Sequence, residues 1–207
     1  MAFGNYTELG EVLKELQVSE HGEEFIELAP VAIEDHFRSR IQFRLNNCPV
    51  RSSEASVCET LIYPVLEEIL LPYAQEMVIW SHLSVSEQGR LLGVPDYILA
   101  KRSPLSPLVR ETPYAACVEA KRNDFEVGWA QCLAAMHALQ RLNAPPERTL
   151  YGIVSDGFVW RFGRLRGQSF VRHPGDFSLY RLDELFAGLN YVFRACKQEI
   201  AAPATAA

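Results

Sequence analysis

The sequence lacks the features that would assign it to several large classes of protein. No apolar run approaches the roughly 18 residues that a membrane-spanning helix needs. The N-terminus has no basic segment followed by an apolar stretch, so no secretory signal is expected. The cysteines form no CxxC pair, which argues against a disulfide framework or a zinc site. They are Cys48, Cys58, Cys117, Cys132 and Cys196. We therefore expect a cytoplasmic protein with reduced, mostly buried thiols.

Motifs of several enzyme classes are missing too, and so is an excess of positive charge. The sequence has no Walker-type phosphate loop, no dinucleotide fingerprint and no apparent Ser-His-Asp arrangement. The net charge of −6 argues against a protein that coats nucleic acid generally. Residues 1–70 carry 13 acids and 5 bases, whereas residues 141–207 carry 6 and 9. Any phosphate-facing surface is therefore local, and a merely solvated basic face is the alternative. Its candidate residues are Arg161, Arg164, Arg166 and Arg172.

The apolar content is large enough for one sizeable core, at 48% of 207 residues. Apolar spacing predicts helices over residues 7–17, 31–46, 52–70, 124–142 and 182–200. Apolar runs between turn residues predict strands over 75–85, 91–100, 114–121, 150–154 and 158–162, and a short one near 169–171. This order predicts an α/β fold with a mixed central sheet flanked by helices. We expect residues 1–50 to form a helical extension packed on a main domain of residues 51–200, and residues 201–207 to form a disordered tail.

Local signals indicate where some of these elements begin or turn. Ser52 or Ser53 is expected to cap the third helix, and Asn123 the fourth. Pro64 lies inside the third helix and is expected to kink it. Residues 155–157, Ser-Asp-Gly, predict a hairpin turn between two strands.

Two short motifs carry the residues with chemical potential. Pro95-Asp96 interrupts one predicted strand, and Glu119-Ala120-Lys121 ends the next. Because side chains alternate along a strand, Glu119 and Lys121 are expected on the same face. Two carboxylates from neighbouring strands can bind a hard divalent cation, which activates water and stabilises charge on phosphorus. Lys121 would deprotonate or orient that water, or offset charge in the transition state.

This pair of motifs, separated by 22 residues, resembles the PD-(D/E)XK restriction-endonuclease-like superfamily. An apolar strand precedes each motif and a helix follows the second. The stretch of residues 118–140 is similar to type I restriction-enzyme nuclease domains and to small bacterial relatives. The resemblance covers residues 53–165. It implies a restriction-endonuclease-like core and a Mg²⁺- or Mn²⁺-dependent nuclease that hydrolyses DNA in restriction, phage defence or repair.

The resemblance also implies roles for individual residues. Asp96 and Glu119 would hold the metal, and Lys121 would assist the attacking water. Gln131, ten residues after Lys121, matches a glutamine that supports the site in such proteins. Each residue also has a purely structural interpretation. Asp96 would be a turn residue, and Glu119 and Lys121 would form an ion pair. Gln131 would be a polar residue on a helix face.

A glutamate on the first core helix commonly joins the metal shell in that family. Here Glu59 and Glu54 are the two candidates. Glu59 is preferred because helical spacing places it on one face with Ile62 and Leu66, directed at the sheet. The alternative is that Glu59 is simply solvated.

A different class of function also fits the sequence. The chain would then be a catalytically weak or inactive protein of the same fold that binds DNA or a partner. Its acidic N-terminal helices would dock a partner subunit or a second copy of the chain. RNA is an alternative substrate that the sequence does not separate from DNA. His82, on the first core strand, is expected to be an ordinary satisfied or exposed histidine rather than a ligand.

Overall fold

The computed structural model describes residues 3–87, 91–122, 124–143 and 147–203. The α-helices are α1 (Leu9–Leu16), α2 (Asp35–Asn47), α3 (Glu54–Val57), α4 (Tyr63–Leu70), α5 (Phe125–Leu142) and α6 (Leu182–Ala201). A π-helical turn, η2 (Cys58–Ile62), joins α3 to α4, and short 3₁₀ turns lie at η1 (Phe3–Asn5) and η3 (Leu71–Tyr73). The expected Asn123 cap lies outside the described residues. Asp124 caps α5 by accepting a hydrogen bond from the N–H of Val127 at 3.1 Å.

Within the described residues, eight strands form one mixed sheet in the order β1-β9-β8-β7-β6-β5-β2, with β10 paired to β8. Their bounds are β1 (Ser19–Gly22), β2 (Met77–Ser81), β5 (Tyr97–Lys101), β6 (Tyr114–Ala120), β7 (Leu150–Ser155), β8 (Val159–Arg166), β9 (Ser169–Arg172) and β10 (Phe177–Ser178). A separate hairpin pairs β3 (Val85–Glu87) with β4 (Leu91–Gly93). The pairs β1–β9 and β6–β7 are parallel, whereas the other pairs are antiparallel.

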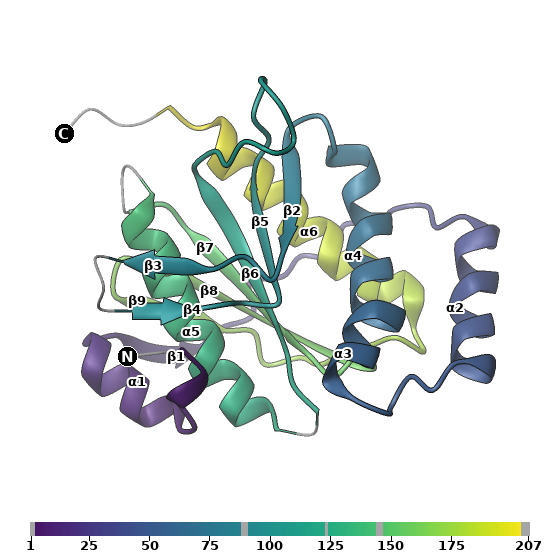
Figure 1. Ribbon diagram of the computed structural model, residues 1–207, viewed down its shortest axis with the longest axis horizontal. Coiled ribbons are helices and arrows are strands. Elements are labelled where there is room, and N and C mark those ends of the chain that lie inside the picture. Colours follow the sequence, from purple (N-terminus) through teal and green to yellow (C-terminus); the bar gives the residue numbers. More distant parts are fainter. Residues whose placement is uncertain (1–2, 88–90, 123, 144–146, 204–207) are drawn as a thin grey trace.

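Helices cover the sheet on both faces, as the sequence predicts (Figure 1). Residues of α1 and α5 share one buried cluster with one face of the strands, while α4 and α6 share the other cluster with the opposite face. Alternation decides which residue enters which cluster: Cys117 of β6 packs with α5, and its neighbours Ala116 and Val118 pack on the other side. The expected α/β class is therefore confirmed.

The N-terminal 50 residues are more than the expected helical extension. Residues 19–22 form β1, which adds an edge strand to the sheet by pairing in parallel with β9. The acidic segment also neutralises the basic strands beside it, because Glu20 pairs with Arg172 and Glu23 lies 2.9 Å from Arg164. The sequence gives no apolar alternation over Ser-Glu-His-Gly, so this strand depends on its non-local partner.

Other local predictions have mixed outcomes. The predicted strand over 75–85 is divided into β2 and β3, and the one over 91–100 into β4 and β5. The turn at residues 155–157 is confirmed, with Gly157 at a φ of 85°. Residues 204–207 of the expected disordered tail lie outside the described residues. In the part of the chain that is described, no helix has the length and apolar character to cross a membrane.

Candidate functional site

The two sequence motifs meet at one edge of the sheet. Asp96 immediately precedes β5, and Glu119 is next to the last residue of β6; Tyr97 pairs with Val118 in the antiparallel register of these strands. One carboxylate oxygen of Asp96 accepts a hydrogen bond from the backbone N–H of Ala120 at 2.7 Å. The register and this hydrogen bond hold Asp96 beside Glu119, as the sequence predicts for neighbouring strands.

Lys121 extends the same edge by one residue. Its N–H donates to the carbonyl of Ser155 at 2.9 Å, which continues the pairing of β6 with β7. Its ammonium lies 3.7 Å from a carboxylate oxygen of Glu119, so the expected common face of these two residues is confirmed. Helix α5 packs closely over the side-chain stem of Lys121 at Gly128. A Cβ atom at this position would lie 3.2 Å from Cγ of Lys121 and 2.5 Å from Cγ1 of Val154. The absence of a side chain at Gly128 therefore permits the close approach.

The first core helix contributes Glu54 rather than the preferred Glu59. Glu54 is the first residue of α3, after Ser53, which caps the helix by accepting from the N–H of Ser56 at 3.0 Å. The ammonium of Lys121 lies 3.2 Å from a carboxylate oxygen of Glu54. Glu59 is exposed. The rival candidate is therefore the one that the structure brings to the motif lysine.

The buried face of this helical segment keeps regular spacing although a π-turn lies within it, over Cys58–Ile62. Pro64 has no N–H to donate to the carbonyl four residues earlier, so the regular hydrogen-bond ladder is interrupted there. The buried residues still follow the i, i+3 and i+4 pattern of one helix face: Cys58, Leu61, Ile62, Val65, Leu66 and Ile69. Ile62 and Leu66 are buried as expected, but Glu59 is exposed and lies outside that face. The preference for Glu59 rested on its spacing from two of these residues, whereas the full set leaves it outside the buried face.

The surroundings of Asp96 and Glu119 disfavour the charged form of both carboxyl groups. Burial, followed by the negative charge of Asp96, raises the pKa of Glu119 to about 8, although Lys121 acts in the opposite direction. The Glu119 residue is only 8% exposed. Burial also raises the pKa of Asp96, and Glu54 adds to this, against the opposing effects of the Ala120 N–H and His82. Both acids would be stabilised as carboxylates by a cation placed between them.

The negative charges at this edge favour the charged form of Lys121, whereas they disfavour the charged form of the acids. Burial lowers the pKa of its ammonium, but the negative charges of Glu119 and Glu54, with a smaller effect from Asp96, outweigh burial and raise it. Lys121 is therefore an ammonium at neutral pH. That state permits it to donate hydrogen bonds and offset negative charge, but not to accept a proton.

His82, expected from the sequence to be an ordinary satisfied or exposed histidine, lies at this edge beside Asp96. It follows β2 and lies opposite Asp96: its N–H donates to the Asp96 carbonyl at 2.8 Å. Its Nε2 lies 3.5 Å from the second Asp96 carboxylate oxygen, and its Nδ1 lies 2.7 Å from the Ser81 hydroxyl. Its φ of 49° is uncommon for a residue with a side chain. The predicted strand over 75–85 places His82 inside a strand, so its position opposite Asp96 follows only from the end of β2 at Ser81 and the pairing of β2 with β5.

Gln131 lies in a different environment from the one that the resemblance implies. It is buried on α5, and its amide nitrogen donates to the carbonyls of Gly4 and Tyr6, both at 3.4 Å. These contacts tie α5 to the N-terminal segment. A supporting role for Gln131 in the site stays a prediction.

The donor set of this edge fits a hard cation only in part. Asp96 and Glu119 supply the carboxylate oxygens that Mg²⁺ and Mn²⁺ prefer. Among the described residues, however, no three side chains of His, Cys, Asp or Glu are grouped so as to hold a metal ion. Mg²⁺ is commonly held by one or two carboxylates, with water and substrate phosphates completing its shell. Two carboxylates are thus a sufficient protein contribution for that ion.

The expected basic surface of the C-terminal half is largely neutralised. Arg161 forms two hydrogen bonds with Asp176, at 2.7 and 3.1 Å, and Arg164 and Arg172 pair with acids of the N-terminal segment. Arg166 is exposed. These contacts favour the solvated-face alternative for three of the four arginines.

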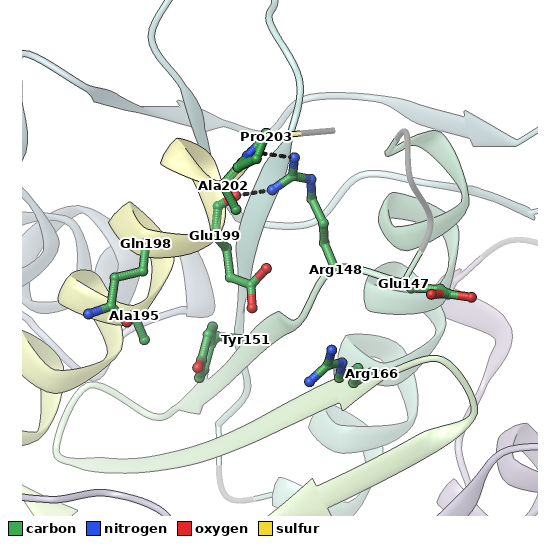
Figure 2. Close-up of a pocket in the computed structure, with 9 residues that line it drawn as sticks. All are labelled: Glu147, Arg148, Tyr151, Arg166, Ala195, Gln198, Glu199, Ala202 and Pro203. Atoms are coloured by element: carbon green, nitrogen blue, oxygen red, sulfur yellow. Dashed lines mark hydrogen bonds between the residues drawn. The ribbon is translucent and has the colours of Figure 1, made fainter. Parts of the chain in front are cut away.

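A separate hollow of about 350 Å³ lies where β7 begins and α6 ends (Figure 2). Its buried arginine, Arg148, donates to the carbonyls of Glu199 and Ala202, the latter at 2.7 Å. These carbonyls belong to the last turn of α6, where a positive charge is favourable. This arginine therefore ties the end of a helix to the sheet, which is a structural role.

Comparison with known proteins gives no assignment for this arrangement. No family model matches the chain, and no curated protein matches it.

Proposed function

We propose that the chain is a divalent-metal-dependent nuclease of the PD-(D/E)XK type that hydrolyses phosphodiester bonds in DNA. The observation that carries this proposal is the convergence of Asp96, Glu119 and Lys121 at one sheet edge. The Asp96 carboxylate is bonded to Ala120 at 2.7 Å, and the Lys121 ammonium lies 3.7 Å from Glu119. The proposal includes a role in restriction, phage defence or repair. Only the resemblance to the nuclease superfamily supports that role.

Asp96 and Glu119 would hold Mg²⁺ or Mn²⁺ through their carboxylate oxygens. Such an ion lowers the pKa of bound water and stabilises the charge that develops on phosphoryl oxygens. The raised pKa values of both acids support this assignment, because a cation relieves the repulsion between two partly buried carboxylates. His82 is positioned to orient Asp96 through its second carboxylate oxygen.

Lys121 would act as a cation. As an ammonium it can orient the attacking water and offset the negative charge of the transition state. Glu54 would hold this lysine in place through its contact at 3.2 Å. Of the roles expected for Lys121, the raised pKa of its ammonium favours orienting the water and offsetting charge over proton abstraction.

The central test is cleavage by the purified protein. Supercoiled plasmid, linear duplex, single-stranded DNA and RNA would be incubated with Mg²⁺, Mn²⁺ or EDTA. Asp96→Asn, Glu119→Gln and Lys121→Met are expected to lose cleavage, while Glu67→Gln, an exposed position on α4, serves as the control for loss of an acid. Cleavage that persists in EDTA, or in all three variants, would overturn the proposal.

Metal binding needs its own readout, independent of cleavage. We expect Mn²⁺ to raise the thermal midpoint of the wild-type protein and to do so far less for Glu119→Gln. Equal shifts in both proteins would show that the ion binds elsewhere.

A second candidate is a protein of this fold that binds a partner and turns over slowly or not at all. It is favoured by one observation: the described residues supply no third metal-ligating side chain beside the two carboxylates. Helix α2 lies at the outer side of the fold (Figure 1) and exposes Phe43 by 61%, so it is the N-terminal element available for a partner or a second copy. Absence of both cleavage and Mn²⁺ binding, with a dimer in light scattering that Phe43→Ala disrupts, would favour this candidate.

A further inference from the structure

A second hollow, of about 560 Å³, is lined in part by Arg51 and Ser52, which precede α3 and its residue Glu54. It lies between the C-terminal end of α2, the segment of residues 48–52, and the rings of Phe158 and Tyr180. This volume falls in the range of pockets that take small organic groups. The hollow thus has walls from three segments that are distant in the sequence.

The aromatic wall is well fixed. Phe158 is 8% exposed, and its N–H donates to the carboxylate of Asp156 at 2.9 Å. Its carbonyl accepts from the N–H of Leu179 at 2.8 Å, which holds the neighbouring Tyr180 beside it. The two rings lie 6.0 Å apart with 32° between their planes, and Tyr180 remains 70% exposed. An exposed ring held against a buried ring offers a flat face to a ligand.

A cation lies on the same wall. The guanidinium of Arg51 lies 4.1 Å from the centre of the Phe158 ring, in a cation–π contact. Among the described residues that line the hollow, Arg51 carries a positive charge and none carries a negative charge. The local charge is thus opposite to that of the molecule as a whole. It suits a ligand that combines a flat ring with negative charge.

The hollow is connected to the sheet edge through the segment that precedes α3. Arg122, next to Lys121, donates to the carbonyl of Ser52 at 3.3 Å, and Ser52 lines the hollow. Two residues further on is Glu54, which contacts Lys121. Two residues of chain span at most about 7 Å. A strand of nucleic acid whose phosphate lies at Lys121 would therefore find Arg122 and then Arg51 along a short path.

We propose that this hollow takes an unpaired nucleobase of single-stranded DNA, adjacent to the phosphate that is cleaved. The inference rests on the proposed nuclease function and names the form of its substrate. Aromatic rings and arginine planes bind bases by stacking, which does not depend strongly on sequence. The amides of Gln42 and Asn46, bonded to each other at 3.2 Å, border the hollow and retain further donors and acceptors for a base edge. A paired base inside a duplex would not reach the Tyr180 face.

The test measures binding without cleavage. A labelled oligodeoxythymidine, an abasic strand of equal length and a blunt duplex would be titrated in EDTA, with fluorescence anisotropy as the readout. The variants are Tyr180→Ala and Arg51→Ala. The controls are Leu108→Ala, which removes another exposed apolar side chain, and Arg110→Ala, which removes an exposed charge; both lie in the loop between β5 and β6, at the opposite end of these strands.

We expect Tyr180→Ala to weaken binding of oligodeoxythymidine about fivefold or more, and both controls to stay within about twofold of wild type. The wild-type protein should bind the abasic strand as weakly as Tyr180→Ala binds oligodeoxythymidine. Arg51→Ala should also reduce the slope of log Kd against log salt by about 0.7, the value for one phosphate of a single strand.

Several results would overturn the proposal. Equal affinity for the abasic strand would show that no base is bound, and equal affinity for the duplex would show that no unpaired base is needed. Unchanged binding by both Tyr180→Ala and Arg51→Ala would place the nucleic acid elsewhere, and no binding by the wild type would also refute it. Self-association that Tyr180→Ala abolishes would identify a second copy as the occupant. Metal-dependent cleavage of plasmid, measured separately, reports on the nuclease function itself.

Discussion

The ammonium of Lys121 lies 3.2 Å from a carboxylate oxygen of Glu54, which joins the start of α3 to the end of β6. These residues are 67 positions apart in the sequence. The Lys121 ammonium also lies 3.7 Å from an oxygen of the Glu119 carboxyl group, so it stands between two acidic side chains. The contact distinguishes Glu54 from Glu59, which is exposed, and we expect Glu54 to position Lys121.

The first prediction compares those two glutamates. Glu54→Gln should lower metal-dependent cleavage by about tenfold or more, because groups that position an active-site residue typically contribute on this scale. Glu59→Gln should stay within about twofold of wild type, since Glu59 is exposed. Initial cleavage rates of a supercoiled plasmid in Mg²⁺ would decide between them. The opposite ranking would restore Glu59 to the site and remove Glu54 from it.

The second prediction concerns stability against pH in the absence of metal. Glu119 has a folded-state pKa of about 8 against a usual value of 4.5, so the folded protein holds a proton that the unfolded chain has lost between these values. The free energy of unfolding should therefore fall as pH rises from about 4.5 to 8, by at most about 1.4 kcal/mol per pH unit for one proton. Asp96, whose pKa is also raised, acts in the same direction.

Urea unfolding in EDTA at several pH values would measure this fall. Glu119→Gln should flatten it, because glutamine has no proton to lose and suffers less from burial. Glu67→Gln, at an exposed acid, should leave the pH dependence as in the wild type. A Glu119→Gln protein with the same pH dependence as wild type would contradict the assigned pKa.

Much of the candidate site could be predicted because it depends on local rules. Alternation along β6 places Glu119 and Lys121 on one face, and the apolar runs identify the two strands that carry the acids. The helix residue could not be predicted in this way. Helical spacing indicates a buried face but not which glutamate meets Lys121, because the contact of Lys121 with Glu54 joins residues 67 positions apart in the sequence.

The fold shows the same division between local and non-local causes. The long helices α5 and α6 follow their apolar spacing, and both form close to the predicted bounds. β1 could not be predicted from apolar spacing, because its four residues are exposed and show no apolar pattern. Its place in the sheet comes from pairing with β9 and from the ion pair of Glu20 with Arg172. Strands of this kind are specified by their partners rather than by their own composition.

The third prediction tests His82 as a positioning residue for Asp96. His82→Asn keeps a side chain that tolerates a positive φ but loses the nitrogen that lies 3.5 Å from Asp96. We expect cleavage to fall by about tenfold while the urea midpoint stays near that of wild type. His21→Asn, at another exposed histidine, is the matched control and should leave cleavage unchanged. Full activity in His82→Asn would show that the Ala120 N–H suffices to position Asp96.

The last prediction separates the two roles open to Gln131. If its amide mainly anchors the N-terminal segment, Gln131→Ala leaves the carbonyls of Gly4 and Tyr6 without their donor and lowers the free energy of unfolding by about 1–3 kcal/mol. Hydrogen exchange over residues 4–8 should then accelerate, while cleavage stays within about twofold of wild type. Gln140→Ala, which removes another buried amide from the same helix, should destabilise the protein without accelerating exchange in residues 4–8 beyond the global effect. A tenfold loss of cleavage in Gln131→Ala, with exchange at the N-terminus unchanged, would instead support the catalytic role that the family resemblance implies.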